Sequence, residues 1–549
     1  MGLALEAPAW PAITADEAAA VLAHFPDAGR LAALAWHSPR PFSAAALVET
    51  DRGPLFLKRH HQRLRTPAAL AEEHGYMAHL RGAGLAVPDV LRAADGAGAI
   101  ALGEWSYELH RQAPGIDLYR DRQSWTPFLS PDHAFAAGVA LAQLHRAAAG
   151  FAAPARGPHP LVSSFTILPA VDPLAAADAY VAARPAVAAF LADRPWRSEL
   201  ARLFAALGQG LASRLAEQPA LWTHNDWHPS NLLWSAEGAV SSIFDFGLST
   251  RSCALHDLAT TIERTAIPWL ALDQGRLAEP ADVDGALALL AGYRSILPLA
   301  PAEIDTLLRL LPLVHIEFAL TEIDYFFGIL DDREGALLAW QAYLVGHADW
   351  FLSGAGQGFL AQLREGIIAV IISFLGIWLT ARRHLLCWPV NLMACALYAK
   401  LFLDVRLYAD MVLQGLFGIA IVYGWIGWAR GKRDEGEVRV VPLPPMRAVK
   451  GLALGALCAG AIGWFTHHYT DAALPWMDSA LSSFSLVAQY WTARRHAASW
   501  LLWIAVDIFY VGMFMFKGLC LTAGLYAAMI GLAVLGYWRW RQVMRRNTA

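Results

Sequence analysis

The sequence predicts a chain of two unlike parts, a soluble α/β (α+β) domain followed by an all-α integral membrane domain. One observation is the change in composition, because residues 1–335 mix apolar with charged residues whereas long apolar runs separated by short loops begin at Gly366. A second is a pentapeptide that recurs within the apolar part. A third is a spaced set of Asp and Asn side chains in the soluble part. We expect the soluble domain to span 1–350, a linker 351–364 and the membrane domain 365–549.

The overall composition lies on the membrane side of the globular range. Of 549 residues, 56% are hydrophobic and 16% are charged, against about 45–50% and about 25% in a typical soluble domain. The net charge of −4 gives no indication of a nucleic-acid partner. The five cysteines show no CxxC spacing, so we expect no disulfide framework and a reducing compartment for the soluble part. The N-terminus lacks a basic start followed by an apolar stretch, so we expect no cleaved export signal.

The apolar runs predict seven crossings of a lipid bilayer. A transmembrane helix needs about 20 mostly apolar residues, and shorter runs are accommodated by snorkelling side chains or a thinned bilayer. Trp and Tyr gather near the ends of the runs, as interfacial residues do. The predicted crossings are residues 366–381, 386–403, 409–429, 447–466, 479–493, 498–516 and 519–538.

An internal repeat organises these crossings. The pentapeptide Thr-Ala-Arg-Arg-His that begins at Thr380 recurs at Thr492, 112 residues later, and the same shift places Trp388 on Trp500. Each copy holds three helices, and three crossings alone would leave the second copy inverted in the membrane. One linking helix at 447–466 gives both copies the same orientation. The expected architecture is a 3+1+3 parallel helix repeat, with a substrate site between the repeats near the bilayer midplane.

Several strings of the membrane part resemble the PnuC family of vitamin transporters. They are Trp388-Pro-Val-Asn391, Tyr408-Ala-Asp410 with Leu413-Gln414, Tyr423-Gly-Trp-Ile-Gly-Trp428, and Trp500-Leu-Leu-Trp503 with Asp507. The resemblance covers about 365–541. It implies a fold similar to that of the SWEET sugar transporters and facilitated diffusion of nicotinamide riboside, with thiamine or riboflavin carried by relatives.

Six residues of this part are candidates for contact with a transported substrate. Polar side chains at mid-membrane depth are costly and mark functional sites by default, and tryptophan faces attract flat cations such as a pyridinium or thiazolium ring. The structural alternative is that the amides join helices by hydrogen bonds and that the tryptophans are interface anchors. The candidates are Trp388, Asn391, Gln414, Trp500, Trp503 and Asp507.

Two clusters in the soluble part carry groups suited to phosphoryl transfer. The first contains His224-x-Asp226 and, five residues after the Asp, Asn231; the second is Asp245-Phe-Gly. Phosphoryl transfer needs a carboxylate that orients the attacking hydroxyl and accepts its proton, and further oxygen ligands that hold Mg²⁺ against the phosphates. Asp226 is the candidate for the first role, and Asn231 and Asp245 for the second, at the spacing of protein kinases.

A lysine for the nucleotide phosphates is also expected. Residues 45–50 and 55–58, joined by a Gly-Pro turn, predict a hairpin that ends at Lys58. The helix that follows carries Glu73, or alternatively Glu72, as the carboxylate that pairs with this lysine.

These residues resemble the aminoglycoside phosphotransferase and choline kinase group, a two-lobed protein-kinase-like fold that acts on small alcohols. The resemblance covers about 15–350 and includes Leu141-Ala-Gln-Leu-His145 and Asp257-Leu-Ala259. It implies ATP and Mg²⁺ as cofactors. The sequence departs from the pattern at Ser38–Ser43, where a Gly-rich phosphate loop would stand.

Other interpretations of these residues stay open. His224, Asp226 and His228 could form a zinc cluster, although the downstream Asn231 and Asp245 favour the kinase interpretation. His224 is otherwise expected to brace the catalytic loop. We expect Asp257 to cap a helix or to tether the catalytic loop, and we expect core or pocket-wall positions for three tryptophans, Trp222, Trp227 and Trp234.

Together the two resemblances imply import of nicotinamide riboside coupled to its ATP-dependent phosphorylation. A phosphoryl group adds roughly two negative charges at neutral pH, so the product leaves the form that the transporter carries. Thiamine, another flat cation with a primary hydroxyl, is the alternative substrate, and the motifs do not separate the two. A kinase-like domain that regulates without turnover and an antibiotic-inactivating kinase are the remaining alternatives.

The membrane topology contains a conflict. Basic residues at 382–383, 430–433, 494–495 and 541–546 are expected in the cytoplasm by the positive-inside tendency, which places the start of the first helix outside. ATP and the missing export signal place the kinase inside a bacterial-type inner membrane, which we expect. Either 336–358 holds an extra crossing or re-entrant segment, or the charge rule fails. In the second case this region forms the last kinase helices and a linker with a flexible point at Gly354–Gly358. A homotrimer or another homo-oligomer is an open expectation.

Overall fold

The computed structural model of the chain falls into two units, Met1–Leu360 and Ala361–Ala549, which are described separately. The structure describes the residues 10–38, 44–120, 122, 124–269, 281–404, 408–431, 433–434, 437–469, 475–516 and 520–546.

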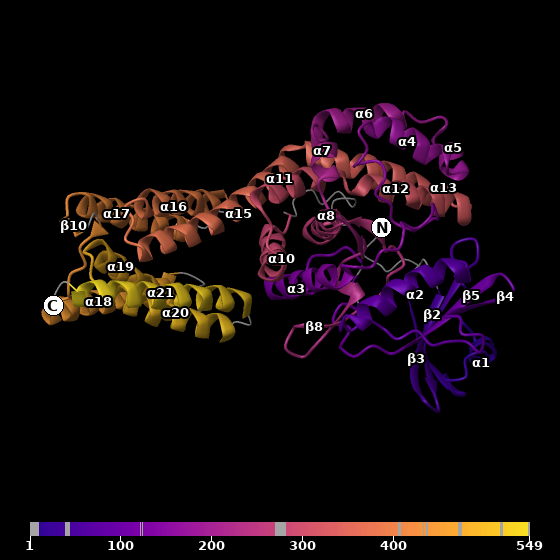
Figure 1. Cartoon of the computed structure of the whole chain (residues 1–549), viewed down its shortest axis with the longest axis horizontal. Helices are drawn as coiled ribbons and strands as arrows, with labels where there is room; N and C mark the ends of the chain where they lie inside the picture. The colour runs from indigo at the N-terminus through magenta and orange to yellow at the C-terminus, as the bar shows by residue number, and fades with distance from the viewer. Residues whose placement is uncertain are drawn as a thin grey trace. The chain divides into compact units, whose positions relative to one another are not determined.

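The first unit begins with a five-stranded antiparallel sheet in the order β1-β2-β3-β5-β4 (Figure 1). Its apolar face packs on the first helix and forms a core that includes Val48, Leu57 and Leu109. Thr14 caps that helix with a reciprocal capping box, and Thr66 caps the second. The elements are α1 (Ala15–Leu22), β1 (Leu31–His37), β2 (Ala44–Thr50), β3 (Gly53–His61), α2 (Pro67–Gly82), β4 (Ala99–Leu102) and β5 (Trp105–Arg111).

The predicted hairpin is present. Strands β2 and β3 pair in register from Ala44 opposite Arg59 to Thr50 opposite Gly53. Gly53 has φ +110°, a conformation that L side chains rarely adopt, so glycine is suited to the turn. The hairpin places Lys58 in the middle of the sheet, between β2 and β5.

The rest of the first unit is a helical lobe with two small β-ribbons. Strands β6 (Ala220–Thr223) and β9 (Thr250–Cys253) form one ribbon, and β7 (Leu232–Trp234) and β8 (Val240–Ile243) form the other. The helices are α3 (Pro131–Ala148), α4 (Pro173–Ala182), α5 (Pro185–Leu191), α6 (Trp196–Leu207), α7 (Leu211–Ala216), α8 (Ala254–Ala266), α10 (Val283–Ile296), α11 (Pro301–Leu310), α12 (His315–Ile323), α13 (Arg333–Leu338) and α14 (His347–Leu352), with short 3-10 or π segments at Pro229–Asn231, Leu311–Leu313, Asp324–Ile329 and Ala339–Gly346.

The segment that could have been an extra crossing belongs to this lobe. Trp340, Tyr343 and Phe351 are buried within the first unit. This burial contradicts the hypothesis of an extra crossing or re-entrant segment near 336–358 and agrees with the alternative that the last helices of the first unit lie here. Their apolar residues resembled a membrane run because they fill a protein core.

The predicted flexible point is also wrong. A continuous helix, α15 (Gly354–Ala381), covers Gly354–Gly358 and most of the predicted linker 351–364. Ser353 supports the start of this helix, because its hydroxyl accepts a hydrogen bond from the Gly356 amide at 3.4 Å. Phe359 is buried and contacts Trp350 with ring centroids 6.0 Å apart. Local packing therefore outweighs the flexibility that three nearby glycines suggest.

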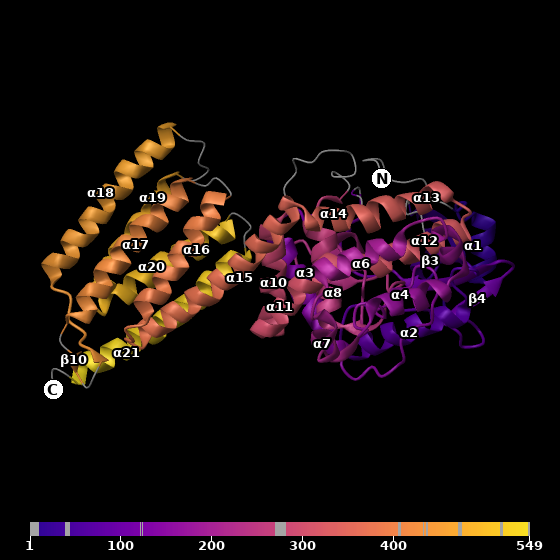
Figure 2. The same ribbon diagram turned by 90° about the horizontal axis from the view of Figure 1, so that it is seen from above.

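The second unit is a bundle of helices that run beside one another (Figure 2). Each of the seven predicted crossings coincides with a helix. By length and composition alone, one unbroken helix in the described part of the chain, Pro445–His468, is long and apolar enough to cross a bilayer, and shorter apolar helical stretches occur elsewhere. The helices are α15, α16 (Cys387–Asp404), α17 (Tyr408–Ala429), α18 (Pro445–Tyr469), α19 (Pro475–Ala493), α20 (Ala498–Phe516) and α21 (Cys520–Arg546).

The two copies of the pentapeptide adopt the same local structure. Arg383 and Arg495 both have positive φ, +58° and +66°, at the end of α15 and of α19. The preceding threonines also have matching contacts: Thr380 accepts a hydrogen bond from the Asn391 amide at 3.3 Å, and Thr492 accepts one from the Trp503 indole at 3.4 Å. Asn391 and Trp503 are 112 residues apart, which is the period of the repeat.

Tryptophans packed against glycines form the core of this unit. A Cβ added at Gly424 would overlap the Trp388 indole, and one added at Gly536 would lie 2.6 Å from the Trp500 indole. Neither glycine can therefore be enlarged without displacing a ring. The four buried indoles in this core are those of Trp388, Trp428, Trp500 and Trp540. Their centroid distances are 5.1 Å (388–428), 5.6 Å (500–540) and 5.8 Å (428–540).

The glycine contact gives a test of this packing. Gly424→Ala should lower the thermal unfolding temperature of the detergent-solubilised protein, because forcing a methyl group into a filled core costs about 1–3 kcal/mol. Gly415→Ala is the matched control in the same helix, since no described atom lies within 4 Å of a Cβ at that position. Equal unfolding temperatures for the two variants would contradict the packing.

Candidate functional site

The loop between β6 and β7 brings two of the predicted catalytic residues together. The Asn231 amide donates hydrogen bonds to the Asp226 backbone carbonyl at 2.9 Å and to its carboxylate at 3.0 Å. Asn225, just before the aspartate, has φ +59°, a left-handed conformation that Asn tolerates better than most residues. The loop therefore holds a carboxylate and an amide side by side at the end of a strand.

Asp257 on α8 anchors this loop by hydrogen bonds to its backbone. Its carboxylate accepts the backbone N–H groups of His224 at 2.9 Å and Asn225 at 2.8 Å. His145 contacts the same carboxylate at 3.0 Å and is itself 2.8 Å from the Tyr293 hydroxyl. Burial would raise the pKa of Asp257, but the His145 contact and the N–H groups lower it, so the charge is retained. The predicted tethering role is confirmed.

The carboxylate predicted to act in catalysis is held ionised by an arginine. Asp226 forms an ion pair with Arg264 of α8, and His228 lies 3.5 Å from the same oxygen. Burial alone would raise the pKa of Asp226, but Arg264 and His228 outweigh it and lower the pKa to about 2. The Asp226 carboxylate therefore remains a hydrogen-bond acceptor throughout the neutral range.

Lys58 and Asp245 form the second half of the site. The Lys58 ammonium lies 3.3 Å from an Asp245 oxygen, and Asp245 has φ +60°. Desolvation would raise the pKa of Asp245, but Lys58 lowers it. Burial would likewise lower the pKa of Lys58, but the charges of Asp245, Glu108 and Glu73 raise it. Both groups are therefore charged, and 47% of the Asp245 side chain is exposed to solvent.

The carboxylates near Lys58 are arranged differently from the prediction. The ion pair at 3.3 Å is with Asp245, whereas Glu73 forms its ion pair with Arg156 at 3.8 Å. Glu72 also pairs with Arg156, at 3.4 Å. Glu73 acts on Lys58 through its electrostatic field, together with the more strongly acting Glu108.

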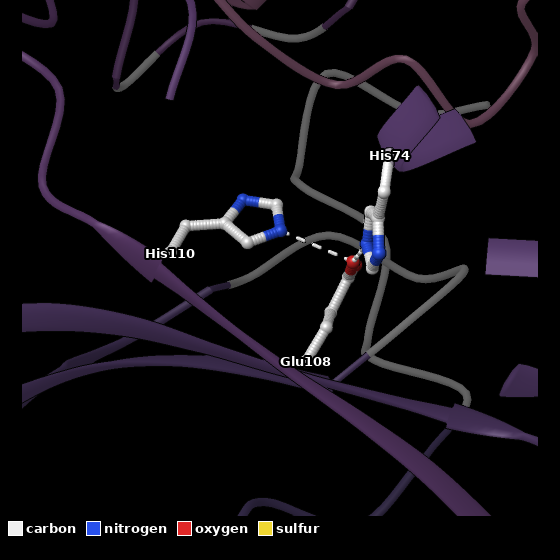
Figure 3. A group of neighbouring side chains, drawn as sticks. All are labelled: His74, Glu108 and His110. Atoms are coloured by element: carbon white, nitrogen blue, oxygen red, sulfur yellow. Dashed lines mark hydrogen bonds and ion pairs between the residues drawn. The ribbon is translucent and has the colours of Figure 1, made fainter. Parts of the chain in front are cut away.

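Glu108 lies opposite Lys58 on the neighbouring strand β5 and is fully buried. Three histidines contact its carboxylate: His74 at 2.6 Å, His110 at 3.1 Å and His60 at 3.1 Å. Figure 3 shows the Glu108 carboxylate between the rings of His74 and His110. The histidines satisfy the carboxylate in a place where an unpaired charge would be costly.

Sequence patterns could have identified two of the residues that were missed. Arg264 follows Asp257 by seven residues, two turns of α8, so both face the catalytic loop. Glu108 becomes visible once β3 is paired with β5, because it then stands directly opposite Lys58. Arg156, whose guanidinium donates to the Gly247 carbonyl at 2.9 Å, has no such local pattern.

The zinc interpretation of His224 is not supported by its contacts. Its Nε2 lies 3.0 Å from the Phe244 carbonyl, and its Nδ1 accepts from the Asp226 amide at 3.3 Å. Both ring nitrogens are therefore used to brace the loop, as the alternative interpretation expected. The three tryptophans expected in the core, Trp222, Trp227 and Trp234, are buried.

The oxygen donors present suit magnesium. A carboxylate and an amide carbonyl are hard ligands of the kind that Mg²⁺ prefers, and Asp245 and Asn231 supply them beside the catalytic carboxylate. Lys58 supplies a positive charge for phosphate on the sheet side. The Ser38–Ser43 segment, which stands where a Gly-rich loop was sought, lies outside the described residues except for Ser38.

The transport candidates occupy two kinds of position. Trp388 and Trp500 belong to the buried tryptophan core, which favours a packing role for them. Asn391 and Trp503 are partly buried and donate to equivalent threonines. The other two candidates are Gln414, partly buried on α17, and Asp507, buried on α20.

Two protein families match separate segments of the chain. Residues 40–299 match the phosphotransferase enzyme family, and residues 365–542 match the family described as nicotinamide mononucleotide transporter.

The curated relatives fall into the same two groups. The nicotinamide riboside transporter PnuC of Escherichia coli is 24% identical over 212 residues, which cover 34% of this chain and 88% of the relative. A homoserine kinase of Xanthobacter autotrophicus is 29% identical over 292 residues, which cover 53% of this chain and 79% of the relative.

Solved structures with similarity to the chain include a vitamin B3 transporter PnuC, with 23% identity, a TM-score of 0.28 and coverage of 33% of this chain and 81% of that one. They also include a microcompartment-associated aminopropanol kinase, with 21% identity, a TM-score of 0.40 and coverage of 62% and 99%.

The ion pair with Arg264 predicts the acid limit of phosphotransfer. A general base works while it is ionised, so a lowered pKa of Asp226 keeps it active at lower pH. In Arg264→Gln the pKa should rise, and the acid limb of the pH profile of kcat/KM should move up by roughly one to two pH units. Arg202→Gln, which removes an exposed arginine paired with Glu199 and Asp349, is the control and should leave the profile unchanged. An unmoved acid limb in Arg264→Gln would contradict the assignment.

Proposed function

We propose that this chain, which joins a segment matching the phosphotransferase enzyme family to one matching the nicotinamide mononucleotide transporter family, imports nicotinamide riboside and phosphorylates it on arrival. The observation that carries the proposal is the convergence of Asp226, Asn231, Asp245 and Lys58 from three separate segments in one site. The identity of the transporter relatives supports the choice of substrate.

The site residues divide the chemistry between them. ATP bound with Mg²⁺ supplies the phosphoryl group. Asp226 orients the acceptor hydroxyl and takes its proton, and Asn231 and Asp245 are the residues that would hold the metal. Lys58 is positioned to bind the nucleotide phosphates. Arg264 keeps Asp226 charged and oriented, so that the carboxylate does not need to lose a proton before it acts.

Phosphorylation gives direction to a transporter that has no energy source of its own. Facilitated diffusion equalises the concentration of the free vitamin, and conversion to a phosphate ester, with roughly two added charges, removes it from that equilibrium. In the membrane unit we assign substrate contact to Asn391, Gln414, Trp503 and Asp507 in the first place. Trp388 and Trp500 stay in this set as residues that shape the site through their packing. The equivalent hydrogen bonds of the two pentapeptides support a 3+1+3 parallel repeat.

The kinase is proposed to lie in the cytoplasm, where ATP is. The seven helices then place the C-terminal ends of α15, α17, α19 and α21 outside, with their basic residues. This arrangement departs from the positive-inside tendency. Residues 333–352 lie inside the first unit, so they are not available as an eighth crossing that would reconcile the two.

The purified full chain should phosphorylate nicotinamide riboside with ATP and Mg²⁺. The panel of acceptors should include thiamine as the alternative vitamin, homoserine because one relative is named a homoserine kinase, and an aminoglycoside. Product formation is measured by mass spectrometry. Transfer to none of these acceptors would refute the coupled scheme. A preference for thiamine would make thiamine the substrate in place of nicotinamide riboside.

Removing the Asp226 carboxylate should abolish retention of the vitamin and leave its transport intact. Asp226→Ala should lower turnover by about 10²–10⁴-fold, while vesicles containing the variant still equilibrate the vitamin. Asp193→Ala, which removes an exposed carboxylate, is the control and should retain both activities. Full intracellular retention of the vitamin by cells that carry Asp226→Ala would instead support a non-catalytic regulatory domain.

Reporters fused to each terminus test the topology. With seven crossings and a cytoplasmic kinase, a fluorescent protein at the N-terminus should fluoresce, and alkaline phosphatase at the C-terminus should be active outside. Alkaline phosphatase activity at the N-terminus would reverse the proposed orientation.

A further inference from the structure

Three buried side chains from three helices meet behind the catalytic loop. They are Glu263 on α8, His315 at the start of α12 and His347 at the start of α14. One ligand atom from each lies within 4.8 Å of the others, and all three residues are at least 96% buried. The Glu263 carboxylate is 2.9 Å from His347 Nδ1. Two imidazoles and a carboxylate are a ligand set typical of zinc.

Four polar atoms of this cluster have no hydrogen-bond partner in the described part of the chain. They are Nδ1 of His315, both ring nitrogens of His347 and one carboxylate oxygen of Glu263, which meets His347 Nδ1 as an ion pair at 2.9 Å. Buried polar atoms are nearly always satisfied, and a group of orphans that face one another indicates an ion or water between them.

A small cavity lies at the same place. Glu263, His315 and His347 line it, and its volume is about 10 Å³. A space of this size is close to the minimum for one water molecule. The cavity therefore excludes an organic ligand and fits a single ion or water.

Neighbouring groups fix the orientation of the cluster. His315 Nε2 lies 3.3 Å from the Leu344 carbonyl. If Nε2 carries the proton and donates it to this carbonyl, Nδ1 is left with a lone pair. The Trp269 indole N–H donates a hydrogen bond to the backbone carbonyl of Glu263 at 3.0 Å. The indole also stacks on the His347 ring, with ring centroids 3.5 Å apart. A backbone carbonyl that holds the second ring nitrogen, as that of Leu344 does for His315, is typical of metal-binding histidines.

The other His-Glu-His cluster differs in how its carboxylate is used, although it also has one ring nitrogen without a partner among the described residues, Nδ1 of His74. His74 and His110 each contact the Glu108 carboxylate directly through Nε2 (Figure 3). Hydrogen bonding within the protein is therefore sufficient to explain this cluster.

We propose that Glu263, His315 and His347 bind a zinc ion in this cavity. Such an ion ties α8 to α12 and α14. Glu263 directly precedes Arg264, the partner of Asp226, so the ion also sets the position of that arginine. The guanidinium of Arg264 is neutralised by Asp226 and lies over the Phe318 ring at 4.4 Å, which keeps its charge directed toward the catalytic carboxylate.

Metal content tests the site in the full chain purified in detergent. The wild type should bind one zinc per chain, measured by elemental analysis after dialysis against a competing chelator. His315→Gln and His347→Gln should each lose it, because two ligands hold the ion weakly. His74→Gln, in the other cluster, is the matched control and should keep the zinc. No zinc in the wild type, or zinc lost with His74→Gln and kept with His347→Gln, would overturn the proposal.

A second measurement avoids dependence on the folding of variants. Wild-type protein stripped of metal should gain thermal stability when Zn²⁺ is added, because an ion that binds only the folded state raises the unfolding temperature. Co²⁺ added in its place should show the visible absorption of a tetrahedral nitrogen and oxygen site. An unchanged unfolding temperature with no cobalt spectrum would assign the cavity to water and overturn the proposal.

Discussion

The buried carboxylate of Asp257 is the interaction on which the catalytic part of this protein depends. It accepts two successive backbone N–H groups of the loop that carries Asp226, and His145 satisfies it from the other side. An unpaired charge at this depth would cost several kcal/mol, whereas a fully hydrogen-bonded one fixes the backbone around it. The loop can therefore hold a left-handed residue next to the catalytic aspartate, and the amide of Asn231 can reach it.

The other buried charges of the site are also paired. Asp226 is paired with Arg264, Asp245 with Lys58, and the carboxylate nearest to Lys58 on its own sheet is enclosed by three histidines. Each pair keeps a group ionised that burial alone would neutralise. In the proposed function, a site prepared in this way needs little reorganisation to bind a charged phosphate and a metal, and such preorganisation is the main contribution a protein makes to phosphoryl transfer.

The membrane unit rests on a different constraint, the close approach of helices. Glycines opposite indole rings allow α16 to pack against α17 and α20 against α21, and the same pair of residues serves both copies of the repeat. Without a hydrophobic driving force between helices in lipid, such packing and a few side-chain hydrogen bonds are what hold a bundle together. The duplicated Thr380 and Thr492 contacts show that the repeat persists at the level of single hydrogen bonds.

The sequence by itself determined the features that lie close together along the chain. Asp226 and Asn231 are five residues apart in one loop, Lys58 lies in a hairpin with its own turn, and the seven long apolar runs coincide with helices. The tertiary structure alone decided which distant groups meet: Arg264 with Asp226, Asp245 rather than Glu73 with Lys58, and Glu263 with two histidines more than fifty residues away. It also decided that Trp388 and Trp500 are buried and that Gly354–Gly358 is helical. The physical reason is that the local sequence encodes backbone preference and periodicity, whereas ion pairing and burial depend on neighbours that only the folded chain supplies.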